Sequence, residues 1–353
     1  MLSSMLLLQP FSKYGLSLKN HVVMSAMTRN FSDKDHNPTD LMRAYYERRA
    51  ANDVGLILTE GTIIHPSGDG YPDVPYIYTD THIEGWKRIT DIIHAYDAKI
   101  FCQLWHCGRI SHPDYLDGEL PVSSSAVRPE GNAPHMQVPM VTPRALEHDE
   151  IPGIVEMFKE ATQKALRAGF DGVEIHGGHG YIIDQLFDAR INQRTDEYGG
   201  SVENRCRFGL EVVKAVLDVA GPGQTALRIS PSREMGGSLY EWPDMEDMLA
   251  YLVPQLDNLG LRMLDISCAR SDTVDIYHAT SGKIVRMVRL MWPHIIIAGA
   301  SLPIEQAEEE IKSGFIDLVT YGRFILANPD FVKKITTGDP LVPYHSDMRK
   351  TLF

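Results

Sequence analysis

The sequence has few cysteines, no long run of hydrophobic residues and no excess of positive charge. Its four cysteines, Cys102, Cys107, Cys206 and Cys268, are scattered along the chain. No pair has the close spacing that is typical of zinc or iron–sulfur sites. We therefore expect reduced thiols and no metal centre.

The lack of a long hydrophobic run argues against a membrane protein. Near the start, Met5–Leu8 is apolar, but no Lys or Arg precedes it. The run is also too short for a signal peptide or a spanning helix. We expect a cytosolic protein that does not associate with membranes.

The charge balance excludes another class of partner. The chain has 34 basic and 47 acidic residues, a net charge of -13, which would repel nucleic acid and anionic membrane surfaces. Its 43% apolar and 23% charged residues are ordinary for a globular protein. Low-complexity tracts and short repeats are absent, so we expect a folded protein that acts on small molecules.

Apolar runs alternate with helix-like stretches along the 353 residues. The runs, typical of strands buried on both faces, are His21–Ala26, Val54–Thr59, Lys99–Leu104, Gly172–Ile175, Thr225–Ile229, Met263–Ser267, Ile295–Ala298 and Ile316–Thr320. The helical stretches are Asp40–Asn52, Ile83–Tyr96, Ile151–Ala168, Val202–Val219, Asp244–Leu259, Gly282–Leu290 and Pro303–Ser313. About eight repeats predict an α/β fold with a single (β/α)8 TIM barrel over residues 1–353. A doubly wound open sheet is the alternative.

The longest irregular stretch, His106–Asp149, follows the third predicted strand and is rich in Pro, Ser and Gly. Such an excursion usually caps or borders an active site. In a TIM barrel that site lies at the carboxyl ends of the strands. The residues found there are Thr28, Glu60, Gly61, Gln103, Trp105, His176, His179, Tyr181, Arg228, Ser267, Gly299, Ala300, Gly322 and Arg323.

The last two strand ends resemble a phosphate site. Ala298–Ser301 is small enough for backbone N–H groups to approach an anion, and Ser301 with Pro303 predicts a helix cap and first turn. Tyr321–Arg323 adds a glycine and a permanent positive charge. The alternative is that these glycines only make tight turns.

The segment His176–Tyr181 places two imidazoles and a phenol at one strand end. Two donors could hold a substrate carbonyl while the phenol delivers a proton. A zinc pair is the rival hypothesis, with His106 or Glu174 as a third ligand, although no metalloenzyme pattern joins them. A purely structural histidine pair is a further alternative.

From Asn20 to about Pro329 the sequence resembles the old yellow enzyme family, with motifs in the family's order. They are Met24–Arg29, Gln103–Arg109, Glu174–Tyr181, Asn192–Ser201, Tyr321–Arg323 and Ala327–Pro329. The resemblance implies a noncovalent FMN across the barrel top, reduced by NADPH or NADH and reoxidised by a substrate in the same pocket.

The resemblance also implies roles for single residues. Ala26, Met27 and Gly61 would meet the flavin, Thr28 its O4, Gln103 the pyrimidine edge and Arg228 the N1–O2 edge. Gly299, Ala300, Gly322 and Arg323 would hold the phosphate. His176 and His179 would grip the electron-withdrawing group of the substrate, Tyr181 would protonate the α-carbon, and Tyr71 and Trp105 would form aromatic walls. The implied substrate is an α,β-unsaturated carbonyl or nitro compound whose C=C bond is reduced.

Departures from the family pattern limit the resemblance. Ala26 stands where proline is common, and the segments 230–237 and 267–276 agree less well. The chain beyond Pro340 is short, which leaves a monomer and a homodimer both open. A flavin-dependent isomerase or biosynthetic reductase, and a flavin-free scaffold barrel, are the alternative functions.

Overall fold

Eight short apolar runs of the chain form one closed barrel. The structure is a computed structural model that describes residues 5–235, 238–267, 281–299 and 301–353. The barrel strands are β3 (Val22–Met24), β4 (Leu56–Ile63), β5 (Lys99–Trp105), β8 (Gly172–His176), β9 (Thr225–Ile229), β12 (Met263–Ser267), β13 (Ile295–Gly299) and β14 (Leu318–Tyr321). Neighbouring strands are parallel, and β14 pairs with β3 to close the ring. The predicted (β/α)8 barrel is confirmed, and the open-sheet alternative is wrong.

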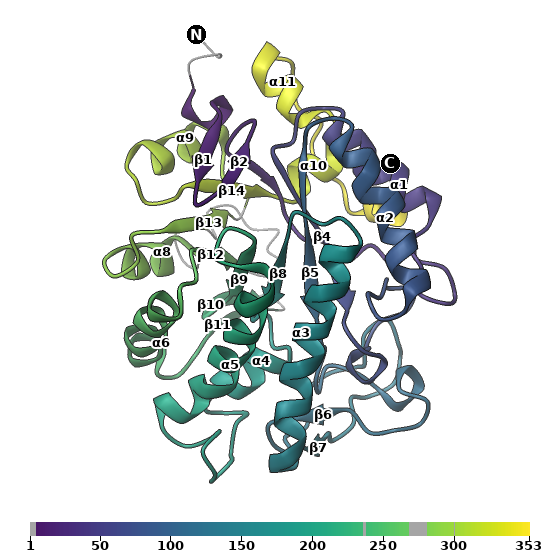
Figure 1. Cartoon of the computed structure of the whole chain (residues 1–353), viewed down its shortest axis with the longest axis vertical. Helices are drawn as coiled ribbons and strands as arrows, with labels where there is room; N and C mark the ends of the chain where they lie inside the picture. Colours follow the sequence, from purple (N-terminus) through teal and green to yellow (C-terminus); the bar gives the residue numbers. More distant parts are fainter. Residues whose placement is uncertain (1–4, 236–237, 268–280, 300) are drawn as a thin grey trace.

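Helices follow the strands and cover the outside of the barrel (Figure 1). The longer ones are α1 (Asp40–Ala50), α2 (Asp80–His94), α3 (Ile151–Arg167), α5 (Val202–Ala220), α6 (Met245–Leu259), α8 (Ser281–Arg289) and α9 (Ile304–Lys312). Three shorter ones are α4 (Ile182–Phe187), α10 (Arg323–Ala327) and α11 (Phe331–Thr337).

Several helices begin where a hydroxyl side chain caps the first turn. The side chains of Thr39, Thr79 and Ser201 accept backbone N–H groups at the starts of α1, α2 and α5. Each cap satisfies a donor that the first turn of a helix leaves without a partner.

Alternation along the strands separates two hydrophobic clusters. Residues such as Ile100, Cys102 and Leu104 of β5 pack with the surrounding helices. Phe101 of the same strand packs inside the barrel with Met263. Because side chains alternate between the faces of a strand, positions of one parity point to the barrel axis.

A hairpin that the sequence did not predict closes one end of the barrel. Strands β1 (Phe11–Lys13) and β2 (Leu16–Leu18) pair antiparallel, and Phe11, Leu16 and Leu18 pack against the apolar interior layer. The hairpin lies at the top of Figure 1, at the amino ends of the barrel strands. The opposite end therefore holds the candidate site.

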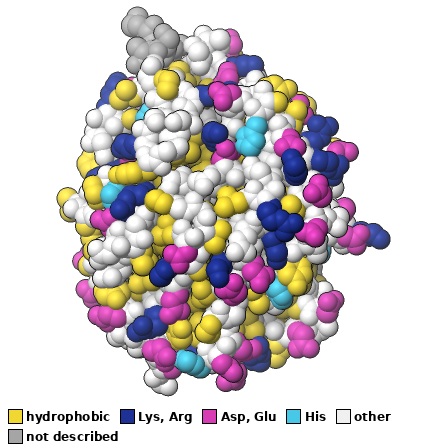
Figure 2. Space-filling model, in the orientation of Figure 1, with side chains coloured by type: hydrophobic (Ala, Val, Ile, Leu, Met, Phe, Trp, Pro, Cys, Tyr) yellow, Lys and Arg dark blue, Asp and Glu magenta, His cyan; other side chains and the backbone are white. Residues whose placement is uncertain are grey.

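Residues 106–150 connect β5 to α3 and include the short strands β6 (Val122–Ser123) and β7 (Arg144–Ala145). Whether this segment caps a site stays a prediction. Strands β10 (Ser232–Met235) and β11 (Ser238–Glu241) form a further hairpin after β9. Within the described ranges, no helix is long and apolar enough to cross a membrane. On the face in Figure 2, acidic and basic side chains are interspersed.

Candidate active site

A layer of polar side chains lies inside the barrel above the apolar layer. It contains Gln103, Glu174, Arg228 and Asp265, each on an inward-pointing position of its strand. The guanidinium of Arg228 is 2.6 Å from Asp265 Oδ2 and 3.2 Å from Glu174 Oε2. The side-chain amide of Gln103 donates to Glu174 Oε2 at 2.6 Å. Gln103 and Arg228, both predicted to contact the flavin, are thus joined through the carboxyl group of Glu174.

Aromatic and imidazole rings gather at the strand ends beyond this layer. The rings of Tyr181 and Trp105 lie 4.9 Å apart, as do those of Tyr181 and His176. The Tyr71 ring is 4.9 Å from Trp105, and its hydroxyl is 2.8 Å from that of Tyr181. His179 lies 5.3 Å from His176. The structure therefore brings together all five residues predicted for the substrate side.

The electrostatics of His176 fit a neutral hydrogen-bonding group. Burial is the largest cause of a pKa well below its ordinary value, and His179, Arg228 and Arg233 lower it further. Its Nδ1 is buried without a hydrogen-bond partner in the described part of the chain. A buried polar atom in this condition indicates a place where a ligand can bind. His176 can therefore offer a ring nitrogen to a substrate oxygen.

Buried contacts fix the loop that carries these residues. The His179 N–H donates to Ser230 Oγ at 2.6 Å, and the Gly180 N–H donates to Asp184 Oδ2 at 2.6 Å. Asp184 also accepts from the Trp242 indole and forms a buried ion pair with Arg233 at 2.9 Å. Arg233, Asp184 and Trp242 are functional supports that the sequence reasoning missed. No motif or spacing in the sequence connects these three residues, so nothing in the sequence indicates that they support the site.

Glycines allow the close packing of this loop. A Cβ at Gly177 would lie 2.8 Å from the Arg228 carbonyl, and one at Gly178 would lie 2.6 Å from Ser230 Oγ. Contacts this short exclude larger side chains there. The packing of β8 against β9 thus accounts for both glycines.

The predicted flavin contacts after β3 and on β4 lie at the same end of the barrel. Ala26 and Met27 are half-buried and Thr28 is exposed. The Arg29 N–H, next to Thr28, donates to the buried Glu60 carboxylate at 3.1 Å, which joins this loop to β4. A Cβ at Gly61 would lie 2.4 Å from the Trp105 ring, so this glycine lets Trp105 pack against β4.

The structure partly places the predicted phosphate residues. Arg323 donates to Ser301 Oγ at 3.2 Å, which joins the ends of β13 and β14. A Cβ at Gly299 would lie 2.3 Å from the Thr320 carbonyl, and one at Gly322 would lie 3.2 Å from Met27 Sδ. Ala300 lies outside the described residues. Phosphate binding by this set stays a prediction.

The expectation that Ser301 caps a helix is wrong. Helix α9 begins at Ile304 with Pro303 as its N-cap residue, and no side chain accepts a hydrogen bond there. Ser301 has a positive φ of 58°, and its hydroxyl faces Arg323 instead. The sequence indicates a loop of small residues, but it does not indicate the left-handed backbone conformation of Ser301.

The rival zinc hypothesis receives no geometric support. Among the described residues, no group of three or more His, Cys, Asp or Glu side chains could hold a metal ion. His106 is buried, and burial lowers its pKa to about 3. Cys102, Cys107 and Cys206 are free and buried, whereas Cys268 lies outside the described residues.

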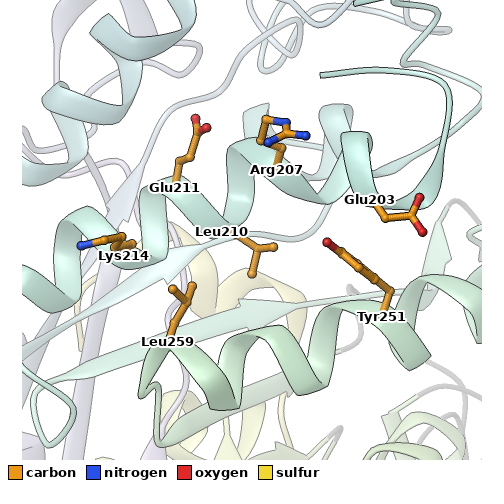
Figure 3. A pocket seen from close by; sticks show the side chains of 7 residues that line it. All are labelled: Glu203, Arg207, Leu210, Glu211, Lys214, Tyr251 and Leu259. Atoms are coloured by element: carbon orange, nitrogen blue, oxygen red, sulfur yellow. The ribbon is translucent and has the colours of Figure 1, made fainter. Parts of the chain in front are cut away.

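A pocket lies on the outside of the barrel, between α5 and α6 (Figure 3). It has a volume of about 210 Å³ and is lined by charged and apolar side chains, among them Glu203, Arg207 and Tyr251. These residues belong to outer helices and not to strand ends. This pocket is therefore separate from the candidate active site.

Comparisons with known proteins agree with the geometry. Residues 6–341 match the NADH:flavin oxidoreductase / NADH oxidase family. The chain is 38% identical over 343 residues to 12-oxophytodienoate reductase 2 of Arabidopsis thaliana, covering 96% of this chain and 90% of that protein. The old yellow enzyme homologue of Zymomonas mobilis superposes with a TM-score of 0.88 at 31% identity, covering 97% and 96% of the two chains. Morphinone reductase in complex with tetrahydroNAD gives a TM-score of 0.87 at 37% identity, covering 97% and 93%.

Proposed function

This chain belongs to the old yellow enzyme family of NADH:flavin oxidoreductases, and on that premise we propose that it binds FMN noncovalently and reduces activated carbon–carbon double bonds. The substrates are α,β-unsaturated carbonyl or nitro compounds. The relatives named as 12-oxophytodienoate and morphinone reductases support this reaction class. The whole chain, 1–353, acts as one FMN-binding barrel domain.

The chemistry of the donor set fits FMN. Arg228 and Gln103 are buried in the layer below the rings, where an amide and a guanidinium can meet the polar edge of a flavin. The Trp105 indole nitrogen and His176 Nδ1 are buried without hydrogen-bond partners in the described ranges. Thr28, Ala26, Met27 and Gly61 would face the ring system, and Gly299, Ala300, Gly322 and Arg323 would hold the phosphate.

One observation carries the proposal. His176, His179, Tyr181, Tyr71 and Trp105 form one ring cluster above the buried Arg228 layer. His176 pairs in register with Arg228 on the adjacent strand, so the two parts of the site are in contact. The cluster lies at the end of the barrel where TIM-barrel enzymes place their chemistry.

The side chains then have separate tasks. When bound, FMN supplies the hydride that is added to the β-carbon. His176 and His179 hold the carbonyl or nitro oxygen and draw electron density from the double bond. The Tyr181 hydroxyl donates its proton to the α-carbon. Tyr71 and Trp105 wall the pocket and keep water from the reacting carbon. The presence of Tyr181 in the cluster favours net reduction over isomerisation.

The test separates the two half-reactions. Under anaerobic conditions, NADPH added to the FMN-loaded protein should bleach the flavin absorbance. Cyclohexenone, a maleimide or a nitroalkene should then restore it within the turnover time. Bleaching without restoration by any of these compounds would overturn the proposed reaction. We propose NADPH as the reductant, with NADH also accepted, and the same experiment run with each nucleotide decides between them.

A further inference from the structure

The buried Arg228 lies between two carboxyl groups. Its Nε and Nη2 donate to Asp265 Oδ2 at 3.0 and 2.6 Å, and its Nε is 3.2 Å from Glu174 Oε2. Both acids have exposed fractions of 0%, and Arg228 is 3% exposed. The three side chains come from adjacent strands β8, β9 and β12. Any charge on this cluster is therefore held inside the barrel.

The charges of these three side chains do not balance if all are ionised. One guanidinium against two carboxylates leaves one net negative charge in the barrel interior. A buried charge without a counter-charge is costly, and a buried acid usually takes up a proton instead. Gln103, the fourth member of the layer, is neutral and donates to Glu174. Gln103 therefore does not change the net charge of the layer.

The hydrogen bonds show where such a proton would lie. Glu174 Oε1 and Asp265 Oδ1 are buried, and neither has a donor among the described residues. The two carboxyl groups are neighbours, because Arg228 Nε lies 3.2 Å from Glu174 Oε2 and 3.0 Å from Asp265 Oδ2. Burial is the largest cause of a pKa of Glu174 well above its ordinary value; Arg228 opposes this shift and Asp265 adds to it. A proton on the pair would give one of the two acids an O–H group that can donate to a neighbouring oxygen.

We propose that Glu174 and Asp265 hold one proton between them, so that the pair carries a single negative charge that cancels the charge of Arg228. The proton belongs to the pair and not to either residue. Glu174 and Asp265 are positioning residues, since they act through Arg228. The inference rests on the proposed function, because it concerns the charge that Arg228 presents to FMN.

The consequence is a lower flavin reduction potential than a bare guanidinium would give. A positive charge beside a flavin stabilises the negative charge that reduction adds. With the acid pair beneath it, Arg228 keeps its hydrogen-bonding geometry but loses most of that stabilisation. The reduced cofactor then remains a strong hydride donor. His176, whose pKa is lowered by burial and by Arg228 and Arg233, adds no compensating charge.

A double-mutant cycle tests the shared proton. The variants Glu174→Gln, Asp265→Asn and the double variant preserve side-chain shape, and the reduction potential of bound FMN is measured by dye equilibration. In each single variant the remaining acid ionises and still cancels Arg228, so the equilibrium constant for reduction should change by less than about threefold. The double variant removes the negative charge that the pair places beside Arg228, and reduction should become favoured by more than about tenfold. Single changes that are each large and add up in the double variant would overturn the proposal.

Infrared spectroscopy gives a readout that does not require the flavin. Recorded above pH 7, where Glu60 has lost its proton, the wild-type spectrum minus that of either single variant should contain a carboxylic acid C=O band that is sensitive to deuterium exchange. A difference spectrum without this band for both single variants contradicts a proton held by this pair. Asp317→Asn, directly before β14, is the control for loss of an acid that is half-buried and ion-paired with Arg289.

Failure of this inference is distinguishable from failure of the proposed function. A chain that takes up no FMN defeats the proposed function, whereas the infrared band still reports the proton. If the double variant does not fold, the potentials of the single variants and their infrared spectra remain decisive.

Discussion

The hydroxyl groups of Tyr71 and Tyr181 lie 2.8 Å apart, although 110 residues separate them in the chain. Tyr71 follows β4 and Tyr181 follows β8, so the barrel brings the two strand ends together. Either hydroxyl can donate in this hydrogen bond. When the Tyr71 hydroxyl donates to the Tyr181 oxygen, the Tyr181 proton remains available for the substrate. The pair therefore links a wall residue to the proposed proton donor.

Replacing Tyr71 by Phe should slow alkene reduction by about tenfold, because loss of one hydrogen bond leaves the Tyr181 hydroxyl less well oriented. Bleaching of the flavin by NADPH should keep its rate. Stopped-flow absorbance measures the two half-reactions separately. Equal slowing of both would show that Tyr71 acts through flavin binding instead.

Replacing Tyr181 by Phe removes the proposed proton donor and should slow alkene reduction by about 100-fold, while sparing reduction by NADPH. The ring remains, so its contacts with Trp105 and His176 are preserved. Unchanged turnover with an enone would remove Tyr181 from the proposed role.

Gly61→Ala should destabilise the protein by about 1–3 kcal/mol and weaken FMN binding. The new methyl group would lie 2.4 Å from the Trp105 ring, which must then move. Chemical denaturation and FMN titration measure the two effects. Gly153→Ala in α3 is the control, because a Cβ there meets nothing within 4 Å. Similar behaviour of the two variants would contradict the packing explanation.

Stability should depend on pH through Glu60. Burial raises the pKa of Glu60 from 4.5 to about 7, although hydrogen bonds from Arg29 and Tyr46 oppose the shift. Below pH 4.5 Glu60 is protonated in both the folded and the unfolded chain, so its ionisation does not change the free energy of unfolding. Between 4.5 and about 7 only the folded chain keeps it, and stability falls as the pH rises through this window.

Glu60→Gln should remove this dependence. The advantage of the variant over wild type, measured by urea denaturation, should grow by about 3 kcal/mol on going from the lower to the upper end of the window. Glu156→Gln, at an exposed position of α3, controls for loss of one negative charge. A constant difference between Glu60→Gln and wild type across the window would show that Glu60 does not titrate there.

The barrel strands could be predicted from the sequence because each is an apolar run buried on both faces. The hairpin of β10 and β11 could not be predicted, since the segment Ser232–Glu241 is polar. The position of this hairpin depends on ion pairs such as that of Arg233 with Asp184. Hairpin β1–β2 was also missed, because strands of three residues are too short to show alternation.

The site was predictable to a similar degree. The motifs identified Tyr181, His176 and Trp105, and the structure brings them together. Asp265 was hidden inside an apolar run, and only the strand register places it against Arg228. The sequence indicates which residues lie at the strand ends. Which side chains meet inside the barrel depends on the register and twist of the strands.

The most direct measurement of the central claim is the binding of FMN by the purified chain. Equilibrium dialysis of the protein, first freed of any flavin, should give one FMN per chain and a yellow complex. Riboflavin should bind more weakly, because it lacks the phosphate that Arg323 and its neighbouring glycines are proposed to hold. A chain that stays colourless and binds neither compound would contradict the account.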